Sequence, residues 1–350
     1  MFLAAKTKGF FVEQNDHATL LARTSAARAP LVIEELLECP AADPAAVEEA
    51  VKRLRPKKSP TGYLNANCGI QPASRVVRRA TLEPKRLKEP GYLAEVLTTQ
   101  CRVEPEKFTV HVLNATDGGD FDGAKGAQKD VLFCGLPSED VIAMQDALLA
   151  VGIYPERLEL ASVAMLGGVV DYLAFNKSKT PTLVLEIGAE ATHSFIVTAG
   201  GVEASRPIAQ GFDSMLPVVQ KELGLKDGES ARKLFFSNTF DFTGMGPLLV
   251  KKLLKELQSS IGFYEVQTGQ SVGQVLCTSM PAKLGWLEGT IASALGVASV
   301  TLDLAPWLRS RQVTLGEGVA ASGLDARWFG LVSLMVYQTV SDAVAAEKKE

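Results

Sequence analysis

The sequence predicts an α/β protein built from two similar domains that face each other across a cleft. Two segments that begin about 175 residues apart share the order β-β-β-α, and such an internal repeat indicates two copies of one structural unit. A length of 350 residues also suits about two domains. The expected strands and helix occupy 9–13, 18–22, 28–36 and 45–54 in the first segment, and 181–188, 192–198, 202–208 and 212–223 in the second.

Local signals support the individual elements. Pro181 to Gly188 is a nearly unbroken apolar run, which is typical of a central strand buried on both faces. The first helix is expected to begin with Asp43 as N-cap and Pro44 at the first helical position. Between the two segments, a loop joins expected strands at 108–115 and 131–134. Further helices are expected at 138–151, 159–175, 244–268, 286–295 and 327–345.

Composition limits the class of protein. A hydrophobic fraction of 47% with 22% charged residues indicates a folded chain, and a net charge of −4 argues against a nucleic-acid-binding protein. The five isolated cysteines favour reduced thiols over disulfides or a zinc ribbon. No signal peptide is expected at the start of the chain, and the longest apolar stretch, 161–170, is far shorter than a membrane-spanning helix. We therefore expect a cytoplasmic protein.

Positive charge is concentrated in one part of the chain. Residues 52–89 hold eleven Lys and Arg against two Glu, a charge of +9, so the remainder carries −13. Such a stretch is either a solvated face or a surface for an acidic peptide or a lipid headgroup. The sequence leaves both readings open.

Catalytic motifs are sparse. None of the three histidines has a second ligand at metal-binding spacing, and the sequence contains neither a Walker loop nor a GxGxxG motif. The loop 117–123 holds three aspartates, but their spacing is not that of an EF-hand. A metal site, a hydrolase and a dehydrogenase therefore have no support.

The most informative segment surrounds Glu186. An apolar strand ends at this carboxylate, Gly188 follows two residues later, and Thr192 opens the returning strand. This order resembles the second phosphate motif of the actin-like fold. There the glycine lets the hairpin backbone approach the phosphates of a nucleotide, and the carboxylate positions hydrated magnesium.

Several stretches resemble, in order and spacing, the PilM family, the actin-like, FtsA-related cytoplasmic proteins of type IV pilus assembly. The matching stretches are 43–51, 64–82, 131–166, 185–211 and 274–297. The resemblance implies an actin-like ATPase fold with two RNase H-like domains and a ferredoxin-like insertion. The implied boundaries are 1–83 with 157–178 for the first domain, 84–156 for the insertion and 179–345 for the second domain.

Two nucleotide motifs depart from the family pattern. The acid and the glycine of the first phosphate hairpin should fall near Phe11 and Glu13, and Ser279-Met280-Pro281 stands where the adenosine motif has a Gly-Gly pair. Together with these departures, the resemblance implies a degenerate nucleotide site. The protein would then be a pseudo-ATPase and not an enzyme, with no cofactor and no metal. If the site is retained instead, ATP and Mg²⁺ would be bound at Glu186, Gly188 and Thr192.

The resemblance implies a scaffold or adaptor that binds the cytoplasmic peptide of a PilN-like single-pass inner-membrane protein, in a groove between the first domain and its insertion. Other pilus assembly proteins are further expected partners, a homodimer is left open, and nucleic acid is excluded. Arg75, Arg78 and Arg79 are the candidate partner-binding residues. The protein would then lie in the cytoplasm, held at the inner membrane through its partners.

Two alternatives remain from the sequence. One is an active actin-like ATPase or sugar kinase, supported by Glu186 and Gly188. The other is a division protein like FtsA, which needs a membrane-tethering amphipathic tail; residues 341–350 are short and highly charged. Whether the assembly forms a pilus or a related secretion system is not decided by the sequence.

Overall fold

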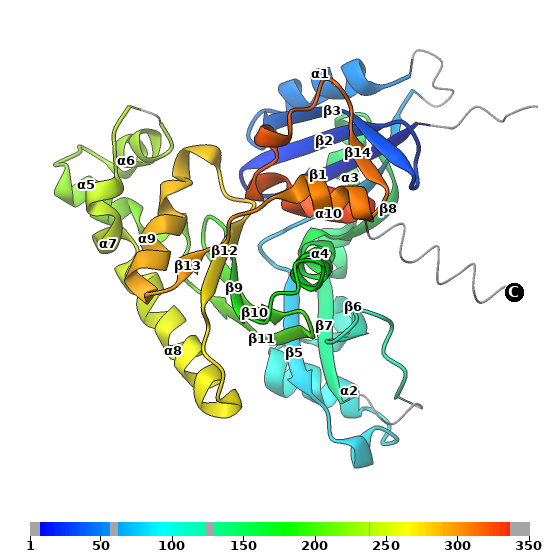
Figure 1. Cartoon of the computed structure of the whole chain (residues 1–350), viewed down its shortest axis with the longest axis vertical. Helices are drawn as coiled ribbons and strands as arrows, with labels where there is room; N and C mark the ends of the chain where they lie inside the picture. The colour runs from blue at the N-terminus through cyan, green and yellow to red at the C-terminus, as the bar shows by residue number, and fades with distance from the viewer. Residues whose placement is uncertain (1–7, 57–61, 124–128, 238, 337–350) are drawn as a thin grey trace, which may run out of the picture.

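The computed structural model describes residues 8–56, 62–123, 129–237 and 239–336 (Figure 1). Its first domain is built on a six-stranded mixed sheet. The strands, in sheet order, are β14 (Val313–Leu315), β3 (Leu31–Pro40), β2 (Ala18–Thr24), β1 (Gly9–Gln14), β4 (Leu64–Ile70) and β8 (Ile153–Leu160). Strands β1, β2 and β3 form an antiparallel meander, and β4 runs parallel to β1.

The second domain repeats this plan with a five-stranded sheet. Its strands, in sheet order, are β11 (Gly201–Ile208), β10 (Thr192–Thr198), β9 (Thr182–Ile187), β12 (Gln274–Thr278) and β13 (Ala298–Ser299). Strands β9, β10 and β11 form the antiparallel meander, and β12 runs parallel to β9. Strands β1 and β9 are therefore equivalent central strands.

A third, antiparallel sheet lies below the first domain in Figure 1. Its order is β5 (Val76–Thr81), β7 (Asp130–Pro137) and β6 (Phe108–Asn114). Alternate residues of β7 point to opposite faces, so Val131 and Phe133 pack under the short helix α2 (Tyr92–Val96), while Leu132 and Cys134 join the main core. We call this unit the insertion.

Two helices lie between the main sheets. Helix α4 (Ala161–Phe175) and the helix 329–336 share one hydrophobic core with both sheets. The outer faces are covered by α1 (Pro44–Leu54) and α3 (Ser138–Ala150) on the first sheet, and by α5 (Leu216–Glu222), α8 (Lys251–Thr268) and α9 (Trp286–Leu295) on the second. The remaining helices are α6 (Gly228–Phe235), α7 (Gly246–Leu249) and α10 (Leu304–Ser310).

Most predicted strands and helices of the repeat are present. Asp43 caps α1 as expected, since its Oδ1 accepts a hydrogen bond from the Ala46 N–H at 3.0 Å. The expected helix 327–345 is seen as 329–336, and the rest of it, like the tail 341–350, lies outside the described residues. Among the described residues, no helix is both long and apolar enough to cross a membrane.

Sheet membership differs from the predicted domain boundaries at both ends of the insertion. Strand β5 belongs to the insertion sheet although it falls within 1–83, and β8 belongs to the first sheet although it begins inside 84–156. The insertion follows the order β-α-β-β-α; a ferredoxin-like unit continues with one more strand, but the next strand here, β8, pairs with β4 of the first sheet. The first sheet has six strands, because β14 returns from late in the chain to pair with β3.

Candidate functional site

The two central strands each end in a buried carboxylate at the boundary between the domains. Glu13 is the penultimate residue of β1, and Glu186 is the penultimate residue of β9. Both are buried, at 0% and 2% exposure. The hairpins that follow close with the same hydrogen bond, from Asn15 N to Ala18 O at 3.1 Å and from Gly188 N to Ala191 O at 2.9 Å.

This equivalence corrects the sequence-based alignment of the first hairpin. Glu13, not Phe11, occupies the position of the acid, and Asn15 occupies the position of Gly188. Phe11 is fully buried in the core between the sheets. The first hairpin therefore keeps its carboxylate and lacks its glycine.

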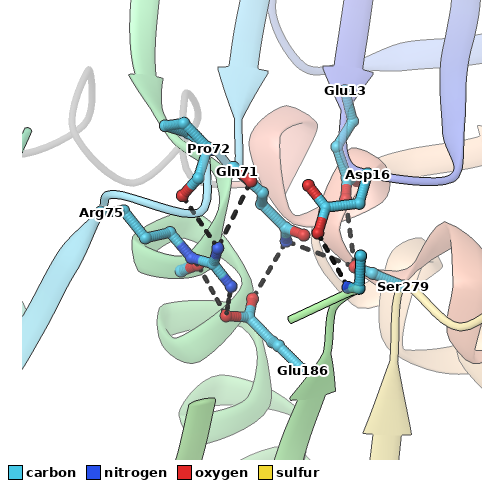
Figure 2. Close-up of polar contacts among 9 residues, drawn as sticks. Glu13, Asp16, Gln71, Pro72, Arg75, Glu186 and Ser279 are labelled. Carbon is cyan, nitrogen blue, oxygen red and sulfur yellow. Dashed lines mark hydrogen bonds and ion pairs between the residues drawn. The ribbon is translucent and has the colours of Figure 1, made fainter. Parts of the chain in front are cut away.

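A buried ion pair joins the two domains (Figure 2). Arg75, in the loop between β4 and β5, lies with its Nη2 at 3.0 Å from Glu186 Oε2. The guanidinium also donates to Ser162 Oγ at 2.9 Å and to the carbonyl of Pro72 at 3.1 Å, and Ser162 Oγ donates to Glu186 Oε2 at 2.7 Å. An ion pair with this many additional hydrogen bonds is fully satisfied without solvent.

Two polar side chains connect Glu186 with Glu13. Gln71 Nε2 donates to Glu186 Oε1 at 3.0 Å and to Ser279 Oγ at 3.3 Å, and Ser279 Oγ donates to Glu13 Oε1 at 3.3 Å. Burial, with the nearby Glu186 charge, raises the pKa of Glu13 to about 8. Glu13 is therefore protonated near neutral pH, which relieves repulsion between the two carboxylates.

The predicted nucleotide-binding residues are all engaged within the protein. Glu186 binds Arg75, and Thr192 Oγ1 donates to the carbonyl of Gln210 at 2.6 Å. The Gly188 hairpin is covered by Asp16 of the first domain, whose Oδ2 accepts a hydrogen bond from Ala189 N at 3.1 Å. A Cβ at Gly188 would lie 2.7 Å from the same oxygen. The glycine thus permits close approach of a protein carboxylate.

The space left between these groups does not fit a nucleotide. The cavity lined by Asp16, Gln71, Arg75 and Gly188 has a volume of about 10 Å³, roughly the minimum that holds one water molecule. A carboxylate, rather than a donor group, lies against the backbone N–H that a phosphate would need. No group of three or more His, Cys, Asp or Glu side chains suited to a metal is present within the described ranges.

The three candidate partner-binding arginines differ in burial and in partners. Arg75 is only 8% exposed, so it does not present its charge on the surface as expected. Arg79 forms an ion pair with Asp130 at 3.0 Å, and Arg78 is half-buried in a groove beside the second domain. The remaining described cations of the basic stretch are distributed over α1 and the insertion, and three of them pair with carboxylates: Arg53 with Glu35, Lys52 with Glu48, and Arg86 with Glu95. Over its described residues, 52–56 and 62–89, the stretch does not form one continuous basic surface.

Another groove lies between the first domain and the insertion, and we call it the β8 groove. Its volume is about 330 Å³. The apolar side chains that line it are Ile70, Leu113, Leu136, Val141, Leu158, Leu160 and Val163; the polar ones include His111, Asp120, Arg157 and Glu159. Four consecutive residues of β8, 157–160, line the groove. Because side chains alternate along a strand, this places the outer edge of β8 along the groove.

One carboxylate oxygen in the β8 groove has no partner. Glu159 Oε1 is buried without a hydrogen bond, while Oε2 is 3.4 Å from Arg157 Nη2. Burial raises the pKa of this carboxyl. An unpaired buried acceptor is costly unless a ligand supplies a donor. Sequence reasoning missed Glu159 because its position beside the insertion depends on how the two units pack.

Two sheets of one repeated topology, shared central helices, and a buried carboxylate at the end of each central strand define the actin-like ATPase fold. Over 95% of this chain, the structure is similar to a chain of the "PilM-PilN type IV pilus biogenesis complex", with a TM-score of 0.67 and 19% identity across 99% of that chain.

Two other solved structures are less similar. The ethanolamine utilization protein EutJ from Carboxydothermus hydrogenoformans has a TM-score of 0.47 at 10% identity, covering 95% of this chain and 91% of that one. A Bacteroides thetaiotaomicron protein with an actin-like ATPase fold has a TM-score of 0.44 at 9% identity, covering 85% and 91%. No protein-family model and no curated protein matches the sequence.

Proposed function

We propose that this protein is a PilM-like scaffold of a type IV pilus or related secretion assembly. In this role it binds the cytoplasmic peptide of a PilN-like single-pass inner-membrane protein in the β8 groove. The observation that carries the proposal is the open edge of β8 beside apolar walls and an unpaired carboxylate. The fold shared with the PilM-PilN complex structure supports it.

An extended peptide suits the β8 groove physically. Strand β8 is the last strand of its sheet, so its outer N–H and C=O groups are available to pair with an added strand. Alternate apolar side chains of the peptide would pack against Leu113, Leu136 and Val141. Glu159 would accept a hydrogen bond from a donor of the peptide, which removes the cost of its unpaired oxygen.

The location of the partner site changes the expected chemistry of the peptide. Arg75, Arg78 and Arg79 do not line the β8 groove, whose charged side chains are Asp120, Arg157 and Glu159. Recognition would therefore depend on apolar contacts and on a donor for Glu159, not on a basic surface that attracts an acidic peptide. Contacts with other pilus assembly proteins, and a position at the inner membrane through these partners, follow from the same proposal.

We also propose that the cleft between the domains is a degenerate nucleotide site and that the protein is a pseudo-ATPase. Support comes from the 10 Å³ cavity and from the Arg75–Glu186 ion pair that fills the cleft. The alternative, an actin-like ATPase that binds ATP and Mg²⁺, requires this ion pair to open. Its buried partners make that opening costly.

A peptide titration tests the docking proposal. The probe is a fluorescent synthetic peptide with the cytoplasmic amino-terminal sequence of the PilN-like protein from the same organism. Val141→Asp places a carboxylate in the apolar wall of the β8 groove and is expected to weaken binding by about tenfold or more. Ile142→Asp is the matched control, because Ile142 is the next residue of α3, is 60% exposed and does not line the groove.

The expected result is strong loss of affinity in Val141→Asp and unchanged affinity in Ile142→Asp, with both variants equally stable to heat. Equal affinity of the two variants and the unmodified protein would place the peptide elsewhere. Absence of binding to the unmodified protein would reject a PilN-like partner.

A further inference from the structure

A second, larger groove lies between the insertion and the second domain, and we call it the α8 groove. Its volume is about 930 Å³. One wall is formed by β5 and the start of β7, the other by α8, and the floor by β9, β10 and β11. It is distinct from the cleft that contains Glu186 and from the β8 groove, and the proposed scaffold role does not use it.

The α8 groove carries an excess of positive charge. Its lining contains four cations, Arg78, Arg79, Lys129 and Arg206, and two anions, Asp130 and Glu203. Arg206 is held in place by Glu256 Oε2 at 2.6 Å and by Ser260 Oγ at 3.1 Å, and Arg79 pairs with Asp130 at 3.0 Å. Counting Glu256, which pairs with Arg206, three carboxylates stand against the four cations, so the groove has a surplus of one positive charge.

Arg78 and Lys129 are the two lining cations without an ion pair among the described residues, and Arg78 is the more buried of the two. It is half-buried, it forms no ion pair among the described residues, and its one hydrogen bond, from Nη2 to the carbonyl of Gln100, is long at 3.5 Å. Its pKa is lowered, first by burial and then by repulsion from Arg102 and Arg206. The Nε of Arg79 is also buried without an acceptor. These groups favour an anion between them.

The geometry favours a compact ligand over an extended peptide. Strands β5 and β11 are both sheet edges, but they already touch, since the Arg79 N–H donates to Ser205 Oγ at 2.6 Å. An added strand needs about 4.8 Å of spacing on each side, so it has no room between these edges. On the opposite wall, the ring of Phe263 is 66% exposed beside the hydroxyls of Ser259 and Ser260.

We propose that the α8 groove binds a small phosphomonoester that carries a flat ring. The phosphate, with a charge of about −2, is bound by Arg78 with Arg206 and Arg79 nearby. The ring packs on Phe263.

Calorimetric titration of the full chain with AMP, adenosine and inorganic phosphate tests this site. AMP is expected to bind with a Kd below about 1 mM, and adenosine more weakly because it lacks the phosphate. Arg78→Gln is expected to weaken the binding of AMP and of inorganic phosphate by about tenfold or more, since it removes charged hydrogen bonds. Arg309→Gln, the same change at an exposed arginine of α10, is the control and should change neither.

Phe263→Ala tests the contact with the ring separately from the contact with the phosphate. It is expected to weaken the binding of AMP by about fivefold or more and to leave the affinity for inorganic phosphate unchanged. Phe263 is exposed, so this variant is expected to fold normally. Unchanged AMP affinity in Arg78→Gln, or no binding of AMP and inorganic phosphate at about 1 mM, would overturn the proposal.

Discussion

At the scale of single residues, the Arg75–Glu186 ion pair is a buried contact in the cleft between the domains. Both side chains are almost fully buried, at 6% and 2% side-chain exposure. Removing one partner of such a pair leaves an uncompensated charge in the interior. The pair thus stabilises the contact between the domains only while both residues are present.

Arg75→Met is expected to lower the free energy of unfolding by about 3–5 kcal/mol, because Glu186 remains buried without its guanidinium. The double variant with Glu186→Gln should recover a large part of this loss, as it also removes the carboxylate charge. Urea denaturation of the three proteins measures both values. Lys233→Met is the control: its pair with Glu229 is about three-quarters exposed, so a change within about 0.5 kcal/mol is expected.

Equal stability of Arg75→Met and the unmodified protein would mean that the ion pair is not formed in solution. The cleft would then be open, and its residues available for a ligand.

Glu13 makes stability depend on pH. Its pKa of about 8 lies above the ordinary value, so the folded protein retains a proton that the unfolded chain releases. The contribution of this group to stability is therefore complete below about pH 4.5 and is lost as the pH rises towards 8. Over that range the loss is on the order of a few kcal/mol.

Glu13→Gln removes this titration. The stability of the variant relative to the unmodified protein is expected to increase from pH 5 to pH 8, as measured by urea denaturation at each pH. Glu48→Gln, at an exposed carboxylate of α1, should show a constant difference. A difference that stays constant or falls with pH for Glu13→Gln would contradict a raised pKa at this site.

At the scale of elements, the crossing of α4 with the helix 329–336 holds the two domains together. Gly168 of α4 lies directly against Ser333: a Cβ at Gly168 would meet the Ser333 Cβ at 2.8 Å and its Oγ still closer. The neighbouring Gly167 has no atom within 4 Å of such a position. Alanine substitutions at these two adjacent glycines therefore distinguish the effect of packing from the effect of helix propensity.

Gly168→Ala is expected to destabilise the protein by about 1–3 kcal/mol through overpacking. Gly167→Ala should stabilise it by about 0.5–1 kcal/mol, because alanine favours the helix and meets no neighbour. Thermal and urea denaturation measure both changes. If Gly168→Ala is as stable as Gly167→Ala, the two helices are not in close contact.

Local patterns predicted the elements well, and pairings between distant segments were missed. The apolar run 181–188 and the capped helix after Asp43 carry their signals within a few residues, and both are present. The pairing of β14 with β3, and the assignment of β5 to the insertion, join segments that sequence periodicity cannot connect. The same limit explains Arg75, whose burial depends on a carboxylate 111 residues away.

At the scale of the whole molecule, the cleft between the two domains of the actin-like fold is filled by side chains near Glu186, and grooves elsewhere are open. The space between the domains is about 10 Å³ near Glu186, whereas the β8 groove is about 330 Å³. This contrast is what the proposed scaffold role requires, since a peptide would bind in the β8 groove while the cleft stays filled.

Mg-ATP at millimolar concentration is expected to leave the melting temperature of the Arg78→Gln variant unchanged, since in this variant the α8 groove contributes little nucleotide binding and the cleft is filled. A ligand at about 100 times its Kd would add about 2.7 kcal/mol, which corresponds to several degrees for a protein of this size. Scanning calorimetry with and without Mg-ATP measures the difference. A clear increase that disappears in Ser279→Trp, a change that places a large ring in the cleft, would show that ATP binds there.

The most direct test of a nucleotide-independent scaffold is one titration of the PilN-like peptide, performed with and without Mg-ATP. The peptide is expected to bind the protein alone, with a Kd that stays the same, within about twofold, when Mg-ATP is added, because the filled cleft and the β8 groove are separate. Binding that requires Mg-ATP, or a Kd that changes by about tenfold or more, would show that nucleotide binding is coupled to the β8 groove. It would contradict a nucleotide-independent scaffold.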